Sequence, residues 1–431
     1  MTAADKKQIN LNKEFNTKRN SLNLVRLFLA LLVIVSHAFI LGGYGKPPKV
    51  LGVDLGSWAV AGFFCISGYL IASSRMHTNL GNYLVKRIAR IYPAFLVIQV
   101  LVVILFAPLA KLINDGSLKG YMSEEPTPLS YLLKNLTLSL WQDHYGIGKT
   151  LVDTPVVHTW NGPLYTLFYE FSCYLIVGLL LSWVVTRNKW AIGIIWAAGV
   201  IGQFTFSRFI LWDPSSQPIT GHNVFQIMVR LVPIFLGGTL VYLIQEKVKK
   251  LYWIVALICA LVCIAYLVLV PEMNENKLGF IAPFATYFLL WFSNSCTFGK
   301  LGKLTSENDI SYGVYIYGWV FQQIIMVFVI NHYIPQPPIW LYIITTIELT
   351  VIFATLSWIF VEHPILQRVR HPRNTKKFDI VTPNSLAEGL AKVEPIVELD
   401  ENLKNLLDKY TSDKKSGGEK NGKTAPSSSR K

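Results

Sequence analysis

Charged residues are scarce in this chain. Of its 431 residues only 15% are Asp, Glu, Lys or Arg, whereas 52% are hydrophobic, and the mean hydropathy is +0.39. Ordinary soluble domains carry about 25% charged residues, which keep their surfaces in water. The shortage of charge therefore excludes an ordinary soluble protein and predicts a protein that resides in a membrane.

Cysteine is also scarce, and several catalytic motifs are absent. The five cysteines lie in or beside apolar runs, which favours small buried side chains over a disulfide framework: Cys65, Cys173, Cys259, Cys263 and Cys296. The sequence contains no zinc-type His/Cys spacing, Walker loop, GxSxG elbow or GxGxxG motif. These absences argue against a metallohydrolase, an ATP-driven pump and a dinucleotide enzyme, and no metal site is expected.

Long apolar runs, by contrast, recur along the chain. A run of about 17 to 25 mainly apolar residues is long enough to cross a bilayer as a helix. We expect an all-α polytopic membrane protein with about ten such helices, at residues 24–41, 57–74, 91–110, 164–185, 190–206, 225–245, 251–270, 278–293, 310–330 and 339–361. The eighth is marginal, because it is short and contains Pro283.

The formal charge of +14 is placed unevenly between the spans. Most lysines and arginines fall in segments that are cytoplasmic if the N-terminus is inside, as in residues 6–19, 86–90, 247–250 and 368–377. This bias fits the positive-inside rule with both termini in the cytoplasm. The excess charge is thus explained by topology, and no nucleic-acid partner is expected.

Three segments follow from this pattern. Residues 1–23 are predicted to be a cytoplasmic N-terminal segment, because the polar first 20 residues are too long and too mixed in charge for the n-region of a typical signal peptide. Residues 24–362 form the predicted transmembrane domain, with an outer loop at about 111–163 that is long enough to suggest an ordered, functional cap. Residues 363–431 are a predicted cytoplasmic tail, with a short amphipathic helix at about 384–410 and a disordered Gly/Ser/Lys-rich end.

The first span contains two ionisable residues inside an apolar run. Arg26, Ala30, Val33 and His37 recur at helical intervals and therefore share one face. Charge in lipid is costly, so this face is expected to look into a protein cavity. The alternative is an arginine that snorkels to the interface and a histidine that only packs.

A basic cluster follows the second span. Lys86 and Arg90 are four residues apart on one predicted helical face, with Arg87 beside them, so the three cations are candidates to bind a phosphorylated ligand from the cytoplasm. The alternative is that they only set the membrane topology.

The fourth span carries a carboxylate. Glu170 follows the stretch Asn161-Gly162-Pro163-Leu164-Tyr165 and lies well inside the apolar run. An unpaired carboxylate there is costly, so Glu170 needs a partner or a wet cavity. The alternative is a purely structural hydrogen bond to a neighbouring helix.

Taken together, these stretches resemble the acyltransferase-3 family of integral membrane acyltransferases, which acylate hydroxyl groups of cell-envelope glycans. The resemblance covers about residues 20–365 and rests on Arg26 to His37, 62–70 (GFFCISGYL), 86–93 (KRIARIYP), 161–170 (NGPLYTLFYE), 310–317 (ISYGVYIY) and 358–364 (WIFVEHP). Three positions depart from the family pattern. Lys86 replaces the first Arg of a basic pair, Tyr165 replaces a Trp, and Gly318 replaces a His that often follows the TyrIleTyr-like run, which concentrates the acid/base role on His37.

The resemblance implies an acyl-CoA donor, with acetyl-CoA favoured, on the cytoplasmic side of a bacterial inner membrane. It also implies a glycan or lipid-linked glycan acceptor, often at the outer face, and no bound cofactor. His37 would be the general base, because the pKa of an imidazole lies near operating pH. Arg26 would stabilise phosphate or oxyanion charge, and Glu170 would orient His37 or hold the acceptor. Asn161 and Tyr165 are candidate acceptor-binding residues.

Two other classes of protein remain open at this level. A transporter or flippase for envelope lipid or glycan also uses buried Arg, His and Glu, although no internal repeat is visible. A structural or sensory membrane protein would act through its tail. The sequence leaves direct transfer and an acyl-enzyme open, with Ser67 or a cysteine as nucleophile only if a base lies near it. It predicts no oligomeric state.

Overall fold

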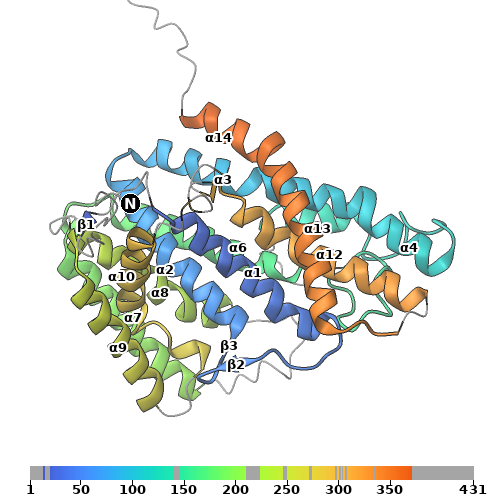
Figure 1. Ribbon diagram of the computed structural model, residues 1–431. Helices are drawn as coiled ribbons and strands as arrows, with labels where there is room; N and C mark the ends of the chain where they lie inside the picture. Colours follow the sequence, from blue (N-terminus) through green and yellow to red (C-terminus); the bar gives the residue numbers. More distant parts are fainter. Residues whose placement is uncertain are drawn as a thin grey trace, which may run out of the picture. The chain divides into compact units, whose positions relative to one another are not determined.

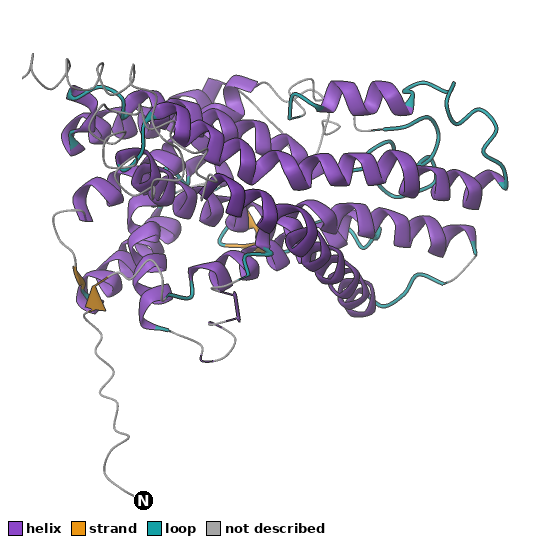
Figure 2. Cartoon of the chain, turned by 90° about the horizontal axis from the view of Figure 1, so that it is seen from above, coloured by secondary structure: helices purple, strands orange, loops and turns teal. Residues whose placement is uncertain are grey.

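The computed structural model describes residues 13–14, 20–138, 146–209, 224–245, 250–270, 274–296, 299, 302, 304–305, 308–332 and 335–370. The predicted amphipathic helix at 384–410 and the predicted disordered end lie outside the described residues. Within the described part the chain is almost entirely helical, which confirms the all-α class (Figures 1 and 2).

The long helices alternate with short helical turns. Their bounds are α1 Leu22–Leu41, α2 Leu55–Met76, α3 Leu80–Leu101, α4 Ala107–Asp115, α5 Pro128–Asn135, α6 Tyr165–Leu180, α7 Lys189–Phe209, α8 Val224–Gln245, α9 Trp253–Leu269, α10 Ala282–Ser295, α12 Ser311–Asn331, α13 Ile339–Ser357 and α14 His363–Arg370. π-Helical turns join α3 to α4 (Val102–Phe106) and α13 to α14 (Trp358–Glu362). Two antiparallel pairs of two-residue strands complete the structure: β1 Lys13–Glu14 with β4 Lys250–Leu251, and β2 Lys49–Val50 with β3 Val53–Asp54.

Every predicted span contains a helix. In the described ranges, seven helical stretches are both long and apolar enough to cross a membrane: Leu22–Leu41, Leu55–Met76, Leu80–Asp115, Gly162–Leu180, Val224–Gln245, Ser311–Ile330 and Ile339–Val369. Helix α9 is apolar but has 17 residues, and α10 has 14. The protein is therefore an integral membrane protein, whereas the number of ten spans stays a prediction. The last stretch also continues helically past residue 362, where the tail was expected to begin.

Close helix packing explains several small residues. α2 packs against both α1 and α8, and α12 packs against α1 and α13. A Cβ atom at Gly68 would collide with the backbone carbonyl of Phe235, and one at Gly318 would collide with the Ile34 side chain. A larger residue at position 318 would therefore push α12 away from α1, which gives a physical reason for glycine there.

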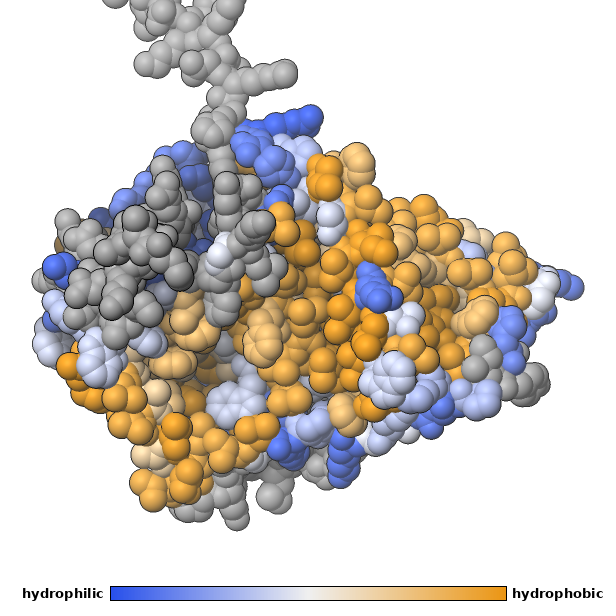
Figure 3. Space-filling model, in the orientation of Figure 1, coloured by the Kyte–Doolittle hydropathy of each residue, from blue (hydrophilic) through white to orange (hydrophobic). Residues whose placement is uncertain are grey.

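The outer surface of the bundle fits a lipid environment. Figure 3 shows a broad hydrophobic area on this face of the molecule, with hydrophilic residues gathered toward its margins. On α9, side chains such as Leu257, Leu261 and Ile264 are at least half exposed. Such an apolar surface is stable in hydrocarbon and unstable in water.

The loop between α4 and α6 is ordered in its described parts, residues 116–138 and 146–161. The buried Lys111 ammonium lies 2.9 Å from Asp115 and 3.1 Å from Glu124, which ties the loop to α4. Further along, the carbonyl oxygen of Thr159 accepts a hydrogen bond of 2.9 Å from Trp319 Nε1 on α12. This segment of the loop thus descends into the helix bundle.

Candidate active site

A cluster of buried charges joins four segments that are far apart in the sequence. Arg26 on α1 and Arg90 on α3 both donate to Asp309 Oδ2, at 2.5 and 2.6 Å. Arg90 also lies 3.4 Å from Glu362, in the turn after α13. The two carboxylates thus balance the two guanidinium groups at the end of the bundle where α1 begins, which topology predicts to be the cytoplasmic end.

Asp309 forms ion pairs with both arginines of this cluster. It lies just before α12, and its Oδ1 accepts a 2.5 Å hydrogen bond from the Ser311 hydroxyl. Burial opposes ionisation of this carboxyl group, but Arg26 and Arg90 outweigh that effect and lower its pKa to about 2. Asp309 is therefore ionised throughout the physiological pH range.

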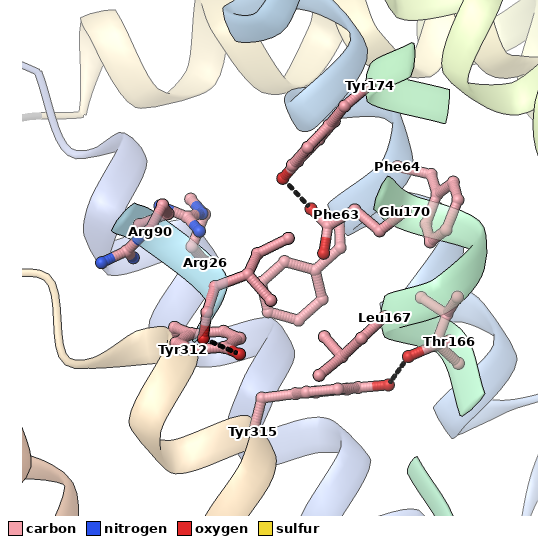
Figure 4. A pocket seen from close by; sticks show the side chains of 12 residues that line it. Arg26, Phe63, Phe64, Arg90, Thr166, Leu167, Glu170, Tyr174, Tyr312 and Tyr315 are labelled. Carbon is pink, nitrogen blue, oxygen red and sulfur yellow. Dashed lines mark hydrogen bonds between the residues drawn. The ribbon is translucent and has the colours of Figure 1, made fainter. Parts of the chain in front are cut away.

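A small cavity lies beside this cluster, with a volume of about 40 Å³, room for a few water molecules. Its lining combines charged groups, phenols and apolar side chains from α1, α2, α3, α6 and α12 (Figure 4). The residues are Arg26, Val60, Phe63, Phe64, Arg90, Ile91, Thr166, Leu167, Glu170, Tyr174, Tyr312 and Tyr315.

Glu170 is paired and faces the cavity, in agreement with the expectation from its place in an apolar run. Its Oε1 accepts a 3.0 Å hydrogen bond from Ser67 Oγ. The same oxygen accepts a 2.6 Å hydrogen bond from the Tyr174 hydroxyl (Figure 4). Oε2 accepts no hydrogen bond from any described residue. One oxygen is thus anchored while the other is available to a group in the cavity.

The three basic residues of α3 have different surroundings. Arg90 lines the cavity, whereas Arg87 lies over the rings of Tyr83 and Tyr174, at 5.9 Å from each centroid. Lys86 is half-buried, outside the cavity lining, and forms no ion pair within the described ranges. The cations therefore do not converge on one point, although the helical spacing had placed Lys86 and Arg90 on one face.

His37 lies on the same face of α1 as Arg26 but nearer its other end. The ring is half-buried and makes an edge-to-face contact with Trp319, with centroids 4.9 Å apart. The carboxylate of Asp54, which caps α2, is close enough to interact electrostatically with the imidazole. His37 is not part of the cavity lining, and the acidic residue within electrostatic range of its ring is Asp54.

The two candidate acceptor-binding residues lie near His37 at the start of α6. Asn161 is fully buried and donates a 2.9 Å hydrogen bond to the Ile316 carbonyl oxygen, which fastens the loop to α12. Tyr165 is half-buried, within electrostatic range of Arg230 and Asp54. Asn161 thus has a structural contact, while Tyr165 belongs to a polar group at the end of the bundle opposite the charge cluster.

Four charged residues of these sites were missed as candidates. Arg230 interrupts the apolar run at 225–245 in the same way that Arg26 interrupts the first span, so the same signal was present. Glu362 occurs in the closing motif of the resemblance. Asp54 and Asp309 lie at span ends, where an acidic residue is common, and the sequence gives no sign of their partners.

Comparison with known proteins decides the class of enzyme. The profile of the acyltransferase-3 family, described as an acyltransferase domain, matches residues 19–361. The chain belongs to this family. It is 26% identical over 358 residues to an O-acetyl transferase of Shigella phage Sf6, an alignment that covers 81% of this chain and 97% of the relative. It is 25% identical over 375 residues to nodulation protein 10 of Rhizobium leguminosarum bv. viciae, covering 83% and 95%.

No solved structure matches this acyltransferase. The family and the relatives support an O-acyltransferase. This decides against a transporter or flippase and against a structural or sensory membrane protein. In the part of the chain that the structure describes, His, Cys, Asp and Glu form no group of three or more that could hold a metal ion.

Proposed function

We propose that this acyltransferase moves an acyl group, with acetyl favoured, from acyl-CoA to a hydroxyl group of a cell-envelope glycan. The name of the phage relative, O-acetyl transferase, supports both the acetyl group and the oxygen acceptor. The donor is bound from the cytoplasmic side, and the acceptor approaches from the opposite side of a bacterial inner membrane.

The observation that carries this proposal is the division of polar groups along α1. Arg26 lines a cavity in the charge cluster, and His37 stands about 16 Å further along the same helix face at 1.5 Å per residue. The wall of the cavity reaches Val60 and Thr166, which lie toward the His37 end of α2 and α6. This geometry supports a donor that enters at Arg26 and an acceptor that is activated at His37.

His37 is the proposed general base. The acceptor oxygen attacks the thioester carbonyl carbon while the imidazole takes the hydroxyl proton, and the C–S bond then breaks. The proton passes from the imidazolium to the departing CoA sulfur, so the histidine returns to its neutral form. The Asp54 carboxylate lies within electrostatic range of this imidazole.

Direct transfer needs no protein nucleophile, and the contacts of Ser67 favour it. The Ser67 hydroxyl donates to Glu170, but Ser67 is not among the residues that line the cavity. A nucleophile must reach the substrate carbonyl as well as a base. Ser67 is therefore assigned to holding Glu170 in place.

The donor phosphates are proposed to bind at Lys86 and Arg87. Both are basic residues at the predicted cytoplasmic end of α3, and neither has an ion-pair partner among the residues described. Arg90 and Arg26 are already neutralised by Asp309 and Glu362. Charge-assisted contacts from unpaired cations are stronger for an incoming phosphate than contacts that must first break an ion pair.

The test uses the full-length protein in proteoliposomes with acetyl-CoA outside and glycan extracted from cells that lack the gene. Free thiol release reports thioester cleavage, and mass spectrometry of the glycan reports acylation. The proposal expects both to rise together and to require both substrates. Acyl-CoA consumption without an increase in glycan mass would contradict the assigned acceptor. The absence of both thiol release and glycan acylation would contradict the assigned donor.

A further inference from the structure

Arg230 is a charged residue within the membrane-spanning helix α8 that makes few hydrogen bonds to the described residues. Its Nη2 donates a 2.9 Å hydrogen bond to Ser57 Oγ on α2, and it forms no ion pair with any described residue. Its Nε is buried and has no hydrogen-bond partner in the part of the chain that the structure describes. A buried, unpaired N–H of a charged group costs free energy that a ligand oxygen would recover.

Three other arginines inside the spans are better satisfied. Arg26 and Arg90 share Asp309, and Arg75 donates to three oxygens, the carbonyls of Gly178 and Thr78 and the hydroxyl of Ser182. Arg87 also has a buried Nε without a hydrogen-bond partner among the described residues, but it lies at the predicted cytoplasmic end of α3, over the rings of Tyr83 and Tyr174. Arg230, toward the other end of the bundle, is thus left needing an acceptor of hydrogen bonds. Intramembrane charges of this kind usually mark a substrate path.

Ser57 links Arg230 to a carboxylate. Its backbone N–H donates to Asp54 Oδ1 at 2.8 Å, while its hydroxyl accepts from Arg230. Oδ2 of Asp54 accepts no hydrogen bond within the described part of the chain. The site thus offers one charged donor, Arg230 Nε–H, and one charged acceptor, Asp54 Oδ2.

This pair is placed next to the proposed base. A Cβ atom at Gly56 would lie 3.2 Å from Asp54 Oδ1 and 3.1 Å from Ser36 Oγ, which brings the carboxylate against α1 beside His37. Tyr165 is within electrostatic range of both Arg230 and Asp54. Val60, about one turn after Ser57 on α2, and Thr166, next to Tyr165 on α6, form part of the cavity wall.

We propose that Arg230 and Asp54 form the binding site for the acceptor and that the group they hold is a neutral sugar hydroxyl. A hydroxyl both donates and accepts a hydrogen bond, so it satisfies the arginine and the carboxylate together. A phosphate or carboxylate would be attracted by Arg230 but repelled by Asp54. This inference rests on the proposed function and adds the residues and the charge state of the acceptor.

The experiment compares Arg230→Gln and Asp54→Asn in proteoliposomes, with acetyl-CoA and glycan extracted from cells that lack the gene. Arg230→Gln is expected to raise the KM for glycan roughly 10- to 100-fold, the range of a lost charge-assisted hydrogen bond, with the KM for acetyl-CoA unchanged. Asp54→Asn keeps the helix cap, because Asn caps as well as Asp. If the bound group is a neutral hydroxyl, Asp54→Asn is also expected to raise the KM for glycan.

The sign of the Asp54 effect identifies the ligand. A lower glycan KM in Asp54→Asn would mean that an anion is bound and would overturn the neutral-hydroxyl assignment. An unchanged glycan KM in Arg230→Gln would overturn the site itself. If Arg230→Gln does not accumulate, Arg230→Lys provides the measurement, because lysine keeps the charge and lacks the Nε donor.

A matched control and a second readout separate this inference from the proposed function. Arg187→Gln makes the same change beyond the far end of α6, where the arginine Nε donates to the Leu181 carbonyl oxygen, and both KM values should stay as in the wild type. Calorimetric titration of the same glycan without acetyl-CoA measures binding alone. If glycan binding depends on Arg230 but the protein consumes no acetyl-CoA, the proposed acyl transfer is refuted and the glycan-binding site at Arg230 is retained.

Discussion

Substitution of Arg90 distinguishes a cation that stabilises the fold from a cation that binds substrate. It bonds Asp309 at 2.6 Å, lies 3.4 Å from Glu362, and its side chain is 15% exposed. Arg90→Gln leaves Glu362, which is 1% exposed, without a cation, and leaves Asp309 with Arg26 alone. We therefore expect the main effect of this change to be on folding and not on donor affinity.

The expected magnitude follows from the burial of the pair. Removal of one partner of a buried ion pair costs about 3 to 5 kcal/mol, because the other charge stays buried and uncompensated. Arg90 has one short contact, to Asp309, and one longer contact of 3.4 Å, to Glu362. We therefore expect the loss of stability to lie at the lower end of this range, about 3 kcal/mol. The melting temperature should fall by several degrees.

Lys86→Gln is the matched control, four residues earlier on the same helix. Lys86 forms no ion pair within the described part of the chain, so its loss should leave the melting temperature unchanged. It should raise the KM for acetyl-CoA up to about tenfold, equivalent to roughly 1.4 kcal/mol. Intrinsic fluorescence melts and thiol-release kinetics measure the two effects. An Arg90→Gln protein with a wild-type melting temperature would refute the reasoning.

Two further predictions concern carboxylates. Glu170→Gln keeps an oxygen that accepts from Ser67 and Tyr174 but removes the negative charge. Turnover should therefore fall on the order of 100-fold while the melting temperature is preserved. A lowered melting temperature with normal turnover per folded molecule would show that the role of Glu170 is structural. Asp309 has a pKa of about 2, below the ordinary 3.8, so its contribution to stability is full above pH 3.8 and is lost as pH falls through 2. Asp309→Asn should therefore lower the melting temperature equally at pH 5 and pH 8, and a difference that disappears at pH 5 would count against the ion pairs.

Local periodicity predicted the helices and the orientation of α1. Ala30 and Val33, on the face with Arg26 and His37, are 0% and 2% exposed, whereas Phe28 on the opposite side is 63% exposed. The expectation of a paired Glu170 in a cavity also followed from one fact, the cost of a bare carboxylate in an apolar environment. Both inferences depend on residues that are near one another in sequence.

Long-range pairing could not be predicted in this way. Arg26 and Asp309 are 283 positions apart, and nothing in either segment specifies the other. Likewise, helical spacing put Lys86 and Arg90 on one face, but the packing of α3 against α12 and the turn after α13 decides that Arg90 alone enters the cavity. Glu170 was expected either to orient His37 or to hold the acceptor, and nothing in the sequence indicated that the start of α2 brings Asp54 within electrostatic range of His37.

The most direct test of the central claim measures glycan acylation by His37 variants. His37→Ala, His37→Gln and His37→Asn are reconstituted, their folded fraction is determined, and the initial rate of glycan acylation is measured by mass spectrometry. A general base predicts a loss on the order of 100-fold or more in all three, with acetyl-CoA binding retained. Near-wild-type turnover in His37→Gln or His37→Asn, whose side chains keep a neutral hydrogen bond, would contradict the assignment.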